Sequence, residues 1–349
     1  ILKLDTPHGI SAATNKGVEI ASGQYVCFLD HDDLLSPDAV HSLAEACREG
    51  YDAVYSDSDK IDDDGERFEP FYKPDWSPEY FRGVMYIGHL LCVRRDLLLE
   101  VGGFDSRFDG IQDYEFFLRY SERTQHIHHI PKILYHWRAV DGSVAASSEA
   151  KGDVSRLQAT AVQEHLNRLG LQAEAVRGEF PHRVQLAPCA RKDLPMVSII
   201  IPTKDNPEMI ERCLYTLFSK TTYSNFEVIC VDNETSDAEA LDVLKTAPVE
   251  RLIFPGAFNF SKANNMGVKQ ARGPYLVFMN NDIEILTPDW IQEMLYYADQ
   301  PDVGAVGALL LYPDETVQHA GVVLGCRGTA DHVSRGASSS TDGYAGSLS

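Results

Sequence analysis

The sequence predicts an α/β protein that contains two tandem copies of one domain, each with a mostly parallel, Rossmann-like sheet. Three observations support this prediction. Short β-branched runs alternate with segments of helical spacing over residues 197–279, a segment near the start repeats 250 residues later, and polar side chains follow the strands directly. Alternating strands and helices are typical of sheets whose parallel strands are joined by right-handed helical crossovers.

The second copy shows the alternation most clearly. Val197 to Ile201 is a β-branched run closed by a proline, which is typical of a buried parallel strand. A helix is predicted over 208–219, where Ile210, Leu214 and Leu217 fall on one face. The same criteria predict strands at 226–231, 251–254 and 274–279 and helices at 237–244 and 261–270.

An internal repeat identifies the two copies. Residues 11–32 and 261–282 align without a gap at an offset of 250, and ten of the 22 positions are identical. A period this long fits two large domains rather than a solenoid. Moved back by 250, the strand at 197–201 would lie before residue 1, so we expect the first copy to lack its N-terminal part and the second its C-terminal part.

The first copy follows the same pattern from its middle onward. Its predicted strands are 24–29, 52–56, 88–94 and 132–137, and its predicted helices are 37–48, 95–101 and 112–122. The acidic segment 57–75, which contains Pro and Gly, is expected to be a loop. We place the first domain at 1–145, a helical linker at 146–194 and the second domain at 195–349.

Composition and charge limit the function classes. Of the 349 residues, 52 are acidic and 31 basic, a formal charge of −21, whereas a protein that binds duplex nucleic acid would show the opposite balance. The seven cysteines form no Cys-x-x-Cys pair, which favours a reducing compartment and a cytoplasmic protein. We expect no transmembrane helix and no signal peptide.

Polar residues follow the predicted strands of the second copy. They are Thr203 and Asp205 after the first strand, Asp232 and Asn233 after the second, and Asp282 after the last. Because ligands bind at the carboxyl ends of the strands in open α/β sheets, we expect these side chains to surround a ligand. Asp and Asn also favour helix caps and turns, so each residue taken alone could be structural.

The run Asp-His-Asp-Asp at residues 30–33 directly follows a strand of the first copy. The carboxylates of Asp30, Asp32 and Asp33 repel one another unless a cation lies between them. Mg²⁺ or Mn²⁺ prefers such oxygen ligands and leaves positions for phosphate oxygens. The alternative is a solvated acidic turn. In the second copy two asparagines precede Asp282, so only the last carboxylate is kept.

Two further segments of the first copy carry reactive groups. Asp113 opens the helix at 112–122, where the helix N-terminus keeps a carboxylate ionised, as a general base requires. His136 and Arg138 end the strand at 132–137, where the histidine could complete a metal site and the arginine could bind phosphate. Each also has a structural alternative, as a helix N-terminal carboxylate or a packed strand end.

Taken together, these segments resemble family-2 glycosyltransferases of the GT-A fold. The resemblance rests on Val197-Ser-Ile-Ile-Ile-Pro-Thr-Lys-Asp-Asn206, Val231-Asp-Asn-Glu-Thr-Ser-Asp237, Phe28-Leu-Asp-His-Asp-Asp33, Gly102-Gly-Phe-Asp105 with Gln112-Asp-Tyr-Glu115, and Asn280-Asn-Asp282. Residues 302–307 with Gln318-His-Ala-Gly321 look like bacterial members that build O-antigen and other surface polysaccharides. The sequence motifs of dehydrogenases, P-loop NTPases, zinc proteases and α/β-hydrolases do not occur.

The resemblance implies inverting transfer of a sugar from a UDP- or dTDP-sugar to a glycan or lipid-linked acceptor. It implies that Asp113 is the general base, and that the base of the second copy would fall at residue 363, beyond Ser349. The implied Mg²⁺ or Mn²⁺ ligands are Asp30, Asp32, Asp33 and His136, with Asp282 as the second-copy counterpart. The implied nucleotide contacts are Thr203, Asp205, Asp232, Asn233 and Arg138.

Two other function classes stay open at this point. A binding module could hold a sugar nucleotide or glycan without turnover, which the two asparagines before Asp282 favour for the second copy. A nucleotidyltransferase shares the nucleotide-binding architecture but usually needs a phosphate loop rich in Gly and Lys, which the second copy lacks. A lipid-linked acceptor would imply peripheral attachment at the inner face of the cytoplasmic membrane.

Overall fold

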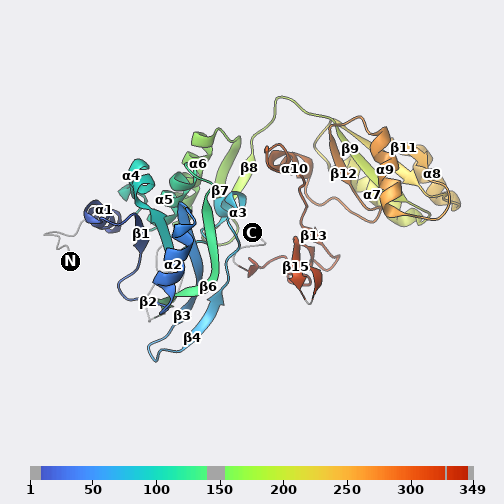
Figure 1. Cartoon of the computed structure of the whole chain (residues 1–349). Helices are drawn as coiled ribbons and strands as arrows, with labels where there is room; N and C mark the ends of the chain where they lie inside the picture. Colours follow the sequence, from blue (N-terminus) through green and yellow to red (C-terminus); the bar gives the residue numbers. More distant parts are fainter. Residues whose placement is uncertain (1–8, 140–153, 327, 345–349) are drawn as a thin grey trace. The chain divides into compact units, whose positions relative to one another are not determined.

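The computed structural model describes residues 9–139, 154–326 and 328–344, which divide into two compact units (Figure 1). The first unit is made by the chain up to Ala187 together with the segment from Ala308 onward, and the second spans Pro188–Gly307. Contacts within the chain define these two units, whereas the sequence repeat defines our domain boundaries at 145/146 and 194/195. Those boundaries therefore stay predictions. Over the residues that the structure describes, no helix is long and apolar enough to cross a bilayer.

The sheet of the first unit is mixed. Its strand order is β1 (Tyr25–Phe28), β5 (Leu91–Arg94), β3 (Ala53–Ile61), β6 (Ile127–Arg138) and β2 (Leu34–Leu35), with β4 (Arg67–Phe71) paired to β3. Only β3 and β6 pair in parallel. The prediction of a mostly parallel sheet is therefore wrong for this unit, because runs of four residues such as β1 and β5 do not show which way a neighbouring strand points.

The predicted loop at 57–75 is also wrong over most of its length, because 57–61 belong to β3 and 67–71 form β4. β3 continues to Ile61 and forms a hairpin with β4, and the turn is closed by the Asp62 carboxylate, which accepts hydrogen bonds from two backbone N–H groups. Asp57 and Asp59 lie in β3 and are buried because they pair with His129 and His136 of β6. Acidic residues whose sequence pattern favours a loop are thus part of the core.

Helices cover the first sheet, and one of them carries the candidate base Asp113. They are α1 (Ile10–Ile20), α2 (Ala39–Arg48), α3 (Pro78–Gly83), α4 (Arg95–Glu100), the 3₁₀ turn η1 (Ser106–Phe108), α5 (Gln112–Ser121) and α6 (Ser155–Leu169). Ala39, Leu43 and Ala46 recur at helical spacing and pack into the core against β3 and β6. Burial of this apolar stripe fixes α2 on the sheet.

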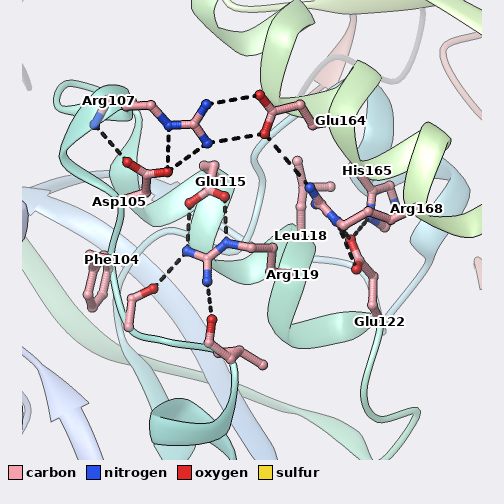
Figure 2. Close-up of polar contacts among 12 residues, drawn as sticks. Phe104, Asp105, Arg107, Glu115, Leu118, Arg119, Glu122, Glu164, His165 and Arg168 are labelled. Carbon is pink, nitrogen blue, oxygen red and sulfur yellow. Dashed lines mark hydrogen bonds and ion pairs between the residues drawn. The ribbon is translucent and has the colours of Figure 1, made fainter.

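The described part of the predicted linker packs on the first domain. α6 lies beside α5, and the part of the predicted linker before residue 154 lies outside the described residues. Figure 2 shows the polar contacts that hold α6: its Arg168 and His165 bond to Glu122 just after α5, and its Glu164 bonds to Arg107 of η1. β7 (Ala173–Arg177) and β8 (Val184–Pro188) then form a two-stranded sheet.

The second unit matches the predicted parallel sheet. Its order is β11 (Glu250–Ile253), β10 (Phe226–Asp232), β9 (Val197–Thr203) and β12 (Tyr275–Phe278), and every pair is parallel. All seven residues of β9 are buried. The covering helices are α7 (Pro207–Lys220), α8 (Ala238–Thr246), α9 (Phe260–Gln270) and α10 (Trp290–Ala298).

The repeat is visible in the elements themselves. α1 and α9, and β1 and β12, begin and end 250 residues apart. A Cβ atom on Gly267 of α9 would lie 2.5 Å from Cγ2 of Ile200 in β9, whereas a Cβ atom on Gly17 of α1 would have no described atom within 4 Å. Close packing therefore requires glycine at this repeat position only in the second unit.

Short hairpins follow α10 in the sequence: β13 (Leu310–Leu311) with β14 (Val317–His319), and β15 (Val322–Cys326) with β16 (Thr329–His332).

Candidate functional site

The residues after β1 form a tight acidic loop that the end of β6 holds in place. The N–H of Asp33 donates to the carbonyl of Asp30 at 3.3 Å, which closes the turn. The Asp33 carboxylate accepts from the Tyr135 hydroxyl at 2.5 Å and from the Arg138 N–H at 2.8 Å. Arg138 Nε also donates to the carbonyl of Asp32 at 2.8 Å. Arg138, predicted to bind phosphate, is thus brought to the predicted metal loop.

Asp30 and Asp32 face solvent, unlike Asp33. Their side chains are 54% and 44% exposed, and Nε2 of His89 lies 3.4 Å from Oδ2 of Asp30. Within the residues that the structure describes, no three His, Cys, Asp or Glu side chains converge closely enough to hold a metal ion by themselves. The loop offers two carboxylates, which is the number through which Mg²⁺ is usually bound when substrate phosphates and water complete its shell.

The structure does not bring His136 to this loop. Its Nδ1 bonds to the Asp59 carboxylate at 2.5 Å, and Asp59 also accepts from Arg67 at 2.6 Å. Both members of the His136–Asp59 pair are buried. Because successive side chains of a strand point to opposite faces, His136 points away from the face on which its neighbour Tyr135 reaches Asp33.

Asp113 lies in the first turn of α5, as predicted. It is half-buried, and its carboxylate accepts a hydrogen bond from the N–H of Tyr114 at 2.9 Å. The Tyr114 hydroxyl donates to the carbonyls of Phe81 and Arg82, at 2.8 Å each. The helix that carries Asp113 is therefore tied to α3 from within the core.

A buried ion pair fixes α5 to the turn before it (Figure 2). Glu115 is 2% exposed and forms two hydrogen bonds with Arg119, at 2.5 and 2.7 Å. The same guanidinium donates to the carbonyls of Val101 and Gly103 at 2.6 and 2.7 Å. Gly103 has φ of 69°, and a Cβ atom there would lie 2.5 Å from Oδ1 of Asn15. The Gly-Gly turn is thus held on both sides, next to the helix of Asp113.

In the second unit, the Asp232 carboxylate is fully buried. It accepts from the N–H and the hydroxyl of Thr235 at 2.8 and 2.5 Å, and from Nε and Nη2 of Arg251 at 2.8 and 2.5 Å. A carboxylate offers about four lone-pair positions, so the protein already uses all of them. The predicted nucleotide contact of Asp232 stays a prediction, and it requires one of these donors to leave.

The other strand ends meet Asp232 at the same edge of the sheet. Thr203 is its register partner in β9, and the Thr203 hydroxyl accepts from the Asn281 side-chain amide at 3.1 Å. Asn233 donates from Nδ2 to the carbonyls of Phe254 and Gly256 at 2.9 and 2.8 Å. The ends of three strands and the loop after β12 therefore converge, as the topology predicts.

Asp205 closes this edge from the loop after β9. Its carboxylate accepts from the N–H groups of Asp237 and Ser236 at 2.9 and 2.7 Å, and these bonds hold the pKa of the Asp205 carboxyl below its ordinary value. Asp282 is exposed beside α7. Burial raises the pKa of the Cys213 thiol to about 12, and the Asp282 charge adds to this effect.

Four residues of these sites do not follow from sequence reasoning: Tyr135 and His89 beside the acidic loop, and Thr235 and Arg251 around Asp232. Thr235 had a signal, because it lies in the Asp-Asn-Glu-Thr-Ser run. The other three lie in strands or loops whose partners are distant in sequence, and no local pattern marks them.

Two family models match the chain, one in each copy. The family described as Glycosyltransferase like family 2 matches residues 3–164, and the family described as Glycosyl transferase family 2 matches residues 198–324. The chain carries two family-2 glycosyltransferase domains. The sequence resemblance and the two-copy organisation are thereby confirmed.

Curated relatives share both family-2 domains. The chain is 39% identical over 340 residues to the O-antigen biosynthesis protein RfbC of Myxococcus xanthus, which covers 95% of this chain and 26% of the relative. It is 41% identical over 333 residues to the protein y4gI of Sinorhizobium fredii, which covers 93% of this chain and 36% of the relative. The chain thus spans about a quarter to a third of the length of these relatives.

Among solved structures, a mannosyltransferase from Pyrobaculum calidifontis in complex with GDP-Man and Mn²⁺ is similar to part of the chain. The likeness covers 36% of this chain and 38% of that one, with 23% sequence identity and a TM-score of 0.31.

Proposed function

We propose that the chain is part of an inverting glycosyltransferase that moves a sugar from a UDP- or dTDP-sugar to a glycan or lipid-linked acceptor during surface-polysaccharide synthesis. The two family-2 domains support the reaction class, and the relative named as an O-antigen biosynthesis protein supports the process. The observation that carries the proposal is the acidic loop after β1, in which Asp33 is fixed by β6 while Asp30 and Asp32 face solvent.

In the proposed reaction, Asp113 is the general base of the first domain. Its carboxylate takes the proton of an acceptor hydroxyl, and that oxygen bonds to the anomeric carbon of the donor. The bond from this carbon to the nucleoside diphosphate breaks on the opposite face, so the product has the inverted configuration. The Asp113 carboxylate lies in the first turn of α5, where the bond from the Tyr114 N–H orients it.

A divalent cation, Mg²⁺ or Mn²⁺, fits the oxygen donors of the acidic loop. Asp30 and Asp32 would hold it together with substrate phosphates, and Asp33 would support the loop from behind. When bound, the cation supplies charge neutralisation for the departing diphosphate. Arg138 lies against the same loop and is suited to phosphate oxygens. His136 could join the site only by leaving its buried bond to Asp59.

For the second domain we propose that Thr203, Asp205, Asp232 and Asn233 surround the nucleotide, with Asp282 as the remaining acidic group. One observation favours a second function here, the binding of a sugar nucleotide or glycan without turnover. At the repeat offset of 250, Asn280 stands where the first domain has Asp30 and Asn281 where it has His31, and the Asn281 amide is bonded to Thr203. Fewer carboxylates give a weaker cation site.

The test is sugar transfer by the chain and by longer versions of the protein, measured as released nucleoside diphosphate and as glycosylated acceptor. UDP- and dTDP-sugars are supplied with Mn²⁺ and lipid-linked saccharides, with and without vesicles. Asp113→Asn should lower turnover about 10²- to 10⁴-fold and leave UDP binding unchanged. Asp96→Asn is the matched control, because Asp96 also accepts from the next N–H in the first turn of a helix. Turnover that survives Asp113→Asn contradicts the proposed base, and UDP binding without any turnover favours the binding module.

A further inference from the structure

Two side chains that no family motif marks contact the acidic loop from inside the first unit. They are Tyr135 of β6 and His89, which precedes β5, and their rings stack at 5.1 Å with planes 28° apart. Each contacts the carboxylate of a different aspartate, Tyr135 that of Asp33 and His89 that of Asp30.

Tyr135 bridges the two ends of the loop with one hydroxyl. The hydroxyl donates to Oδ2 of Asp33 at 2.5 Å and accepts from the N–H of Asp30 at 3.2 Å. The tyrosine therefore fixes the Asp33 carboxylate relative to the Asp30 backbone.

His89 contacts the carboxylate of Asp30 itself. Its side chain is 17% exposed, and Nε2 lies 3.4 Å from Oδ2 of Asp30. Its Nδ1 is buried, with no hydrogen-bond partner among the described residues. A buried N–H without an acceptor is costly, so the favoured neutral tautomer carries its proton on Nε2, facing Asp30.

A buried lysine bonds to the backbone of His89 from within the core. Nζ of Lys73 donates to the carbonyls of Ile87 and His89 at 2.5 and 2.6 Å, and Lys73 is 6% exposed. The Lys73 N–H in turn donates to the buried Asp57 carboxylate at 2.8 Å. The position of the His89 ring is thus set by the core and not by the solvent-exposed loop.

We propose that Tyr135 and His89 are positioning residues that set the placement of the Asp30 and Asp33 carboxylates, and with it the affinity of the loop for a divalent cation beside a nucleoside diphosphate. The inference rests on the proposed function. Groups that orient metal-binding side chains typically change metal affinity about 10- to 100-fold when they are removed. Tyr135→Phe and His89→Gln should each weaken Mn²⁺ binding by about 10-fold or more.

The experiment is a titration of the full chain with Mn²⁺ in the presence of UDP, with free Mn²⁺ followed by electron paramagnetic resonance. Two matched controls exist in the same unit. Like Tyr135, Tyr120 accepts a backbone N–H with its hydroxyl and donates to a protein oxygen, here the carbonyl of Asp52. Like His89, His41 lies 3.4 Å from a carboxylate, that of Glu45. Tyr120→Phe and His41→Gln should leave Mn²⁺ affinity unchanged. UDP affinity without metal, and amide exchange of β6, should be the same in wild type, Tyr135→Phe and His89→Gln.

Each result decides one point. Weaker Mn²⁺ binding in Tyr135→Phe and His89→Gln alone, with unchanged metal-free UDP affinity, supports the positioning role. Mn²⁺ affinity equal to wild type in both variants overturns this inference and leaves the proposed function intact. A wild-type chain that binds UDP but no Mn²⁺ contradicts the cation site of the proposed function, and the positioning role with it. A loss in the Tyr120→Phe control equal to that in Tyr135→Phe also overturns the inference, since it would show a general effect of removing a buried hydroxyl.

Discussion

Arg251→Met tests how strongly the second unit depends on the charge pair beneath its ligand edge. The substitution keeps the volume of the side-chain stem and removes both hydrogen bonds from Arg251 to Asp232, a carboxylate that is 0% exposed. Breaking a buried ion pair costs about 3–5 kcal/mol, because the remaining charge is left without compensation. Arg251 is 27% exposed in its side chain, so water reaches the vacated position and we expect the lower end, about 3 kcal/mol.

The cost should depend on pH, because an unpaired carboxyl can take up a proton instead. Neutralising a carboxyl with an ordinary pKa of about 3.9 costs about 1.36 kcal/mol for each pH unit above that value. This sets a ceiling of about 4 kcal/mol at pH 7 and about 1.5 kcal/mol at pH 5. The destabilisation by Arg251→Met should therefore fall by about half between pH 7 and pH 5.

The assay is native-state amide exchange of the full chain, read by mass spectrometry on peptides that contain β9 and β10. Exchange is preferred to a global melt because the two units can open separately. The control is Arg212→Met, which removes a pair with Glu284 whose members are 62% and 44% exposed and which should cost less than about 1 kcal/mol. A cost below about 1 kcal/mol for Arg251→Met at pH 7, or an equal cost at both pH values, would refute the reasoning.

Three further predictions concern stability. Gly267→Ala places a Cβ atom 2.5 Å from Ile200 and should destabilise the second unit by about 1–3 kcal/mol, measured by exchange of β9. Gly17→Ala, the equivalent change in α1, meets no described atom within 4 Å and should stabilise α1 by up to about 1 kcal/mol; a loss in both units would disprove the packing argument. Burial lowers the pKa of Lys73 from 10.5 to about 7. The unfolded chain then binds more protons between these values, so the wild type should gain stability from pH 7 to pH 9 relative to Lys73→Met, and a constant difference in melting temperature would count against the shift.

The second unit was predictable because its signals are local. The β-branched run at 197–201 marks a buried strand, and the carboxyl ends of parallel strands meet by topology alone, so Thr203 and Asp232 were placed together correctly. What the sequence could not show is which protein groups already bond to Asp232. The guanidinium of Arg251 arrives there through the register of β10 with β11, a pairing between residues about twenty positions apart.

The first unit was less predictable because its polar groups are paired across long distances. Asp57 and Asp59 read as loop residues, since an acid in a strand core is rare unless it is paired. Their partners lie more than seventy residues later in β6. The contact of Tyr135 with the loop after β1 could not be predicted for the same reason. An aromatic residue in a strand suggests packing, whereas the Tyr135 hydroxyl bonds to Asp33 of that loop.

The two buried acid–histidine pairs also constrain how the chain can fold. β3 and β6 are long, and a slip of two residues between them would keep every side chain on its proper face. In the native register Asp59 lies opposite His136 and bonds to it, and the Asp57 side chain bonds to His129, whose register partner is Tyr55. A slipped pairing would take the histidine partner from both buried carboxylates, and Asp57 would keep only the Lys73 N–H and Asp59 only Arg67. The pairs therefore favour one register between the parallel strands β3 and β6. Because Tyr135 and Arg138 of β6 bond to Asp33, this register also sets the position of the loop after β1.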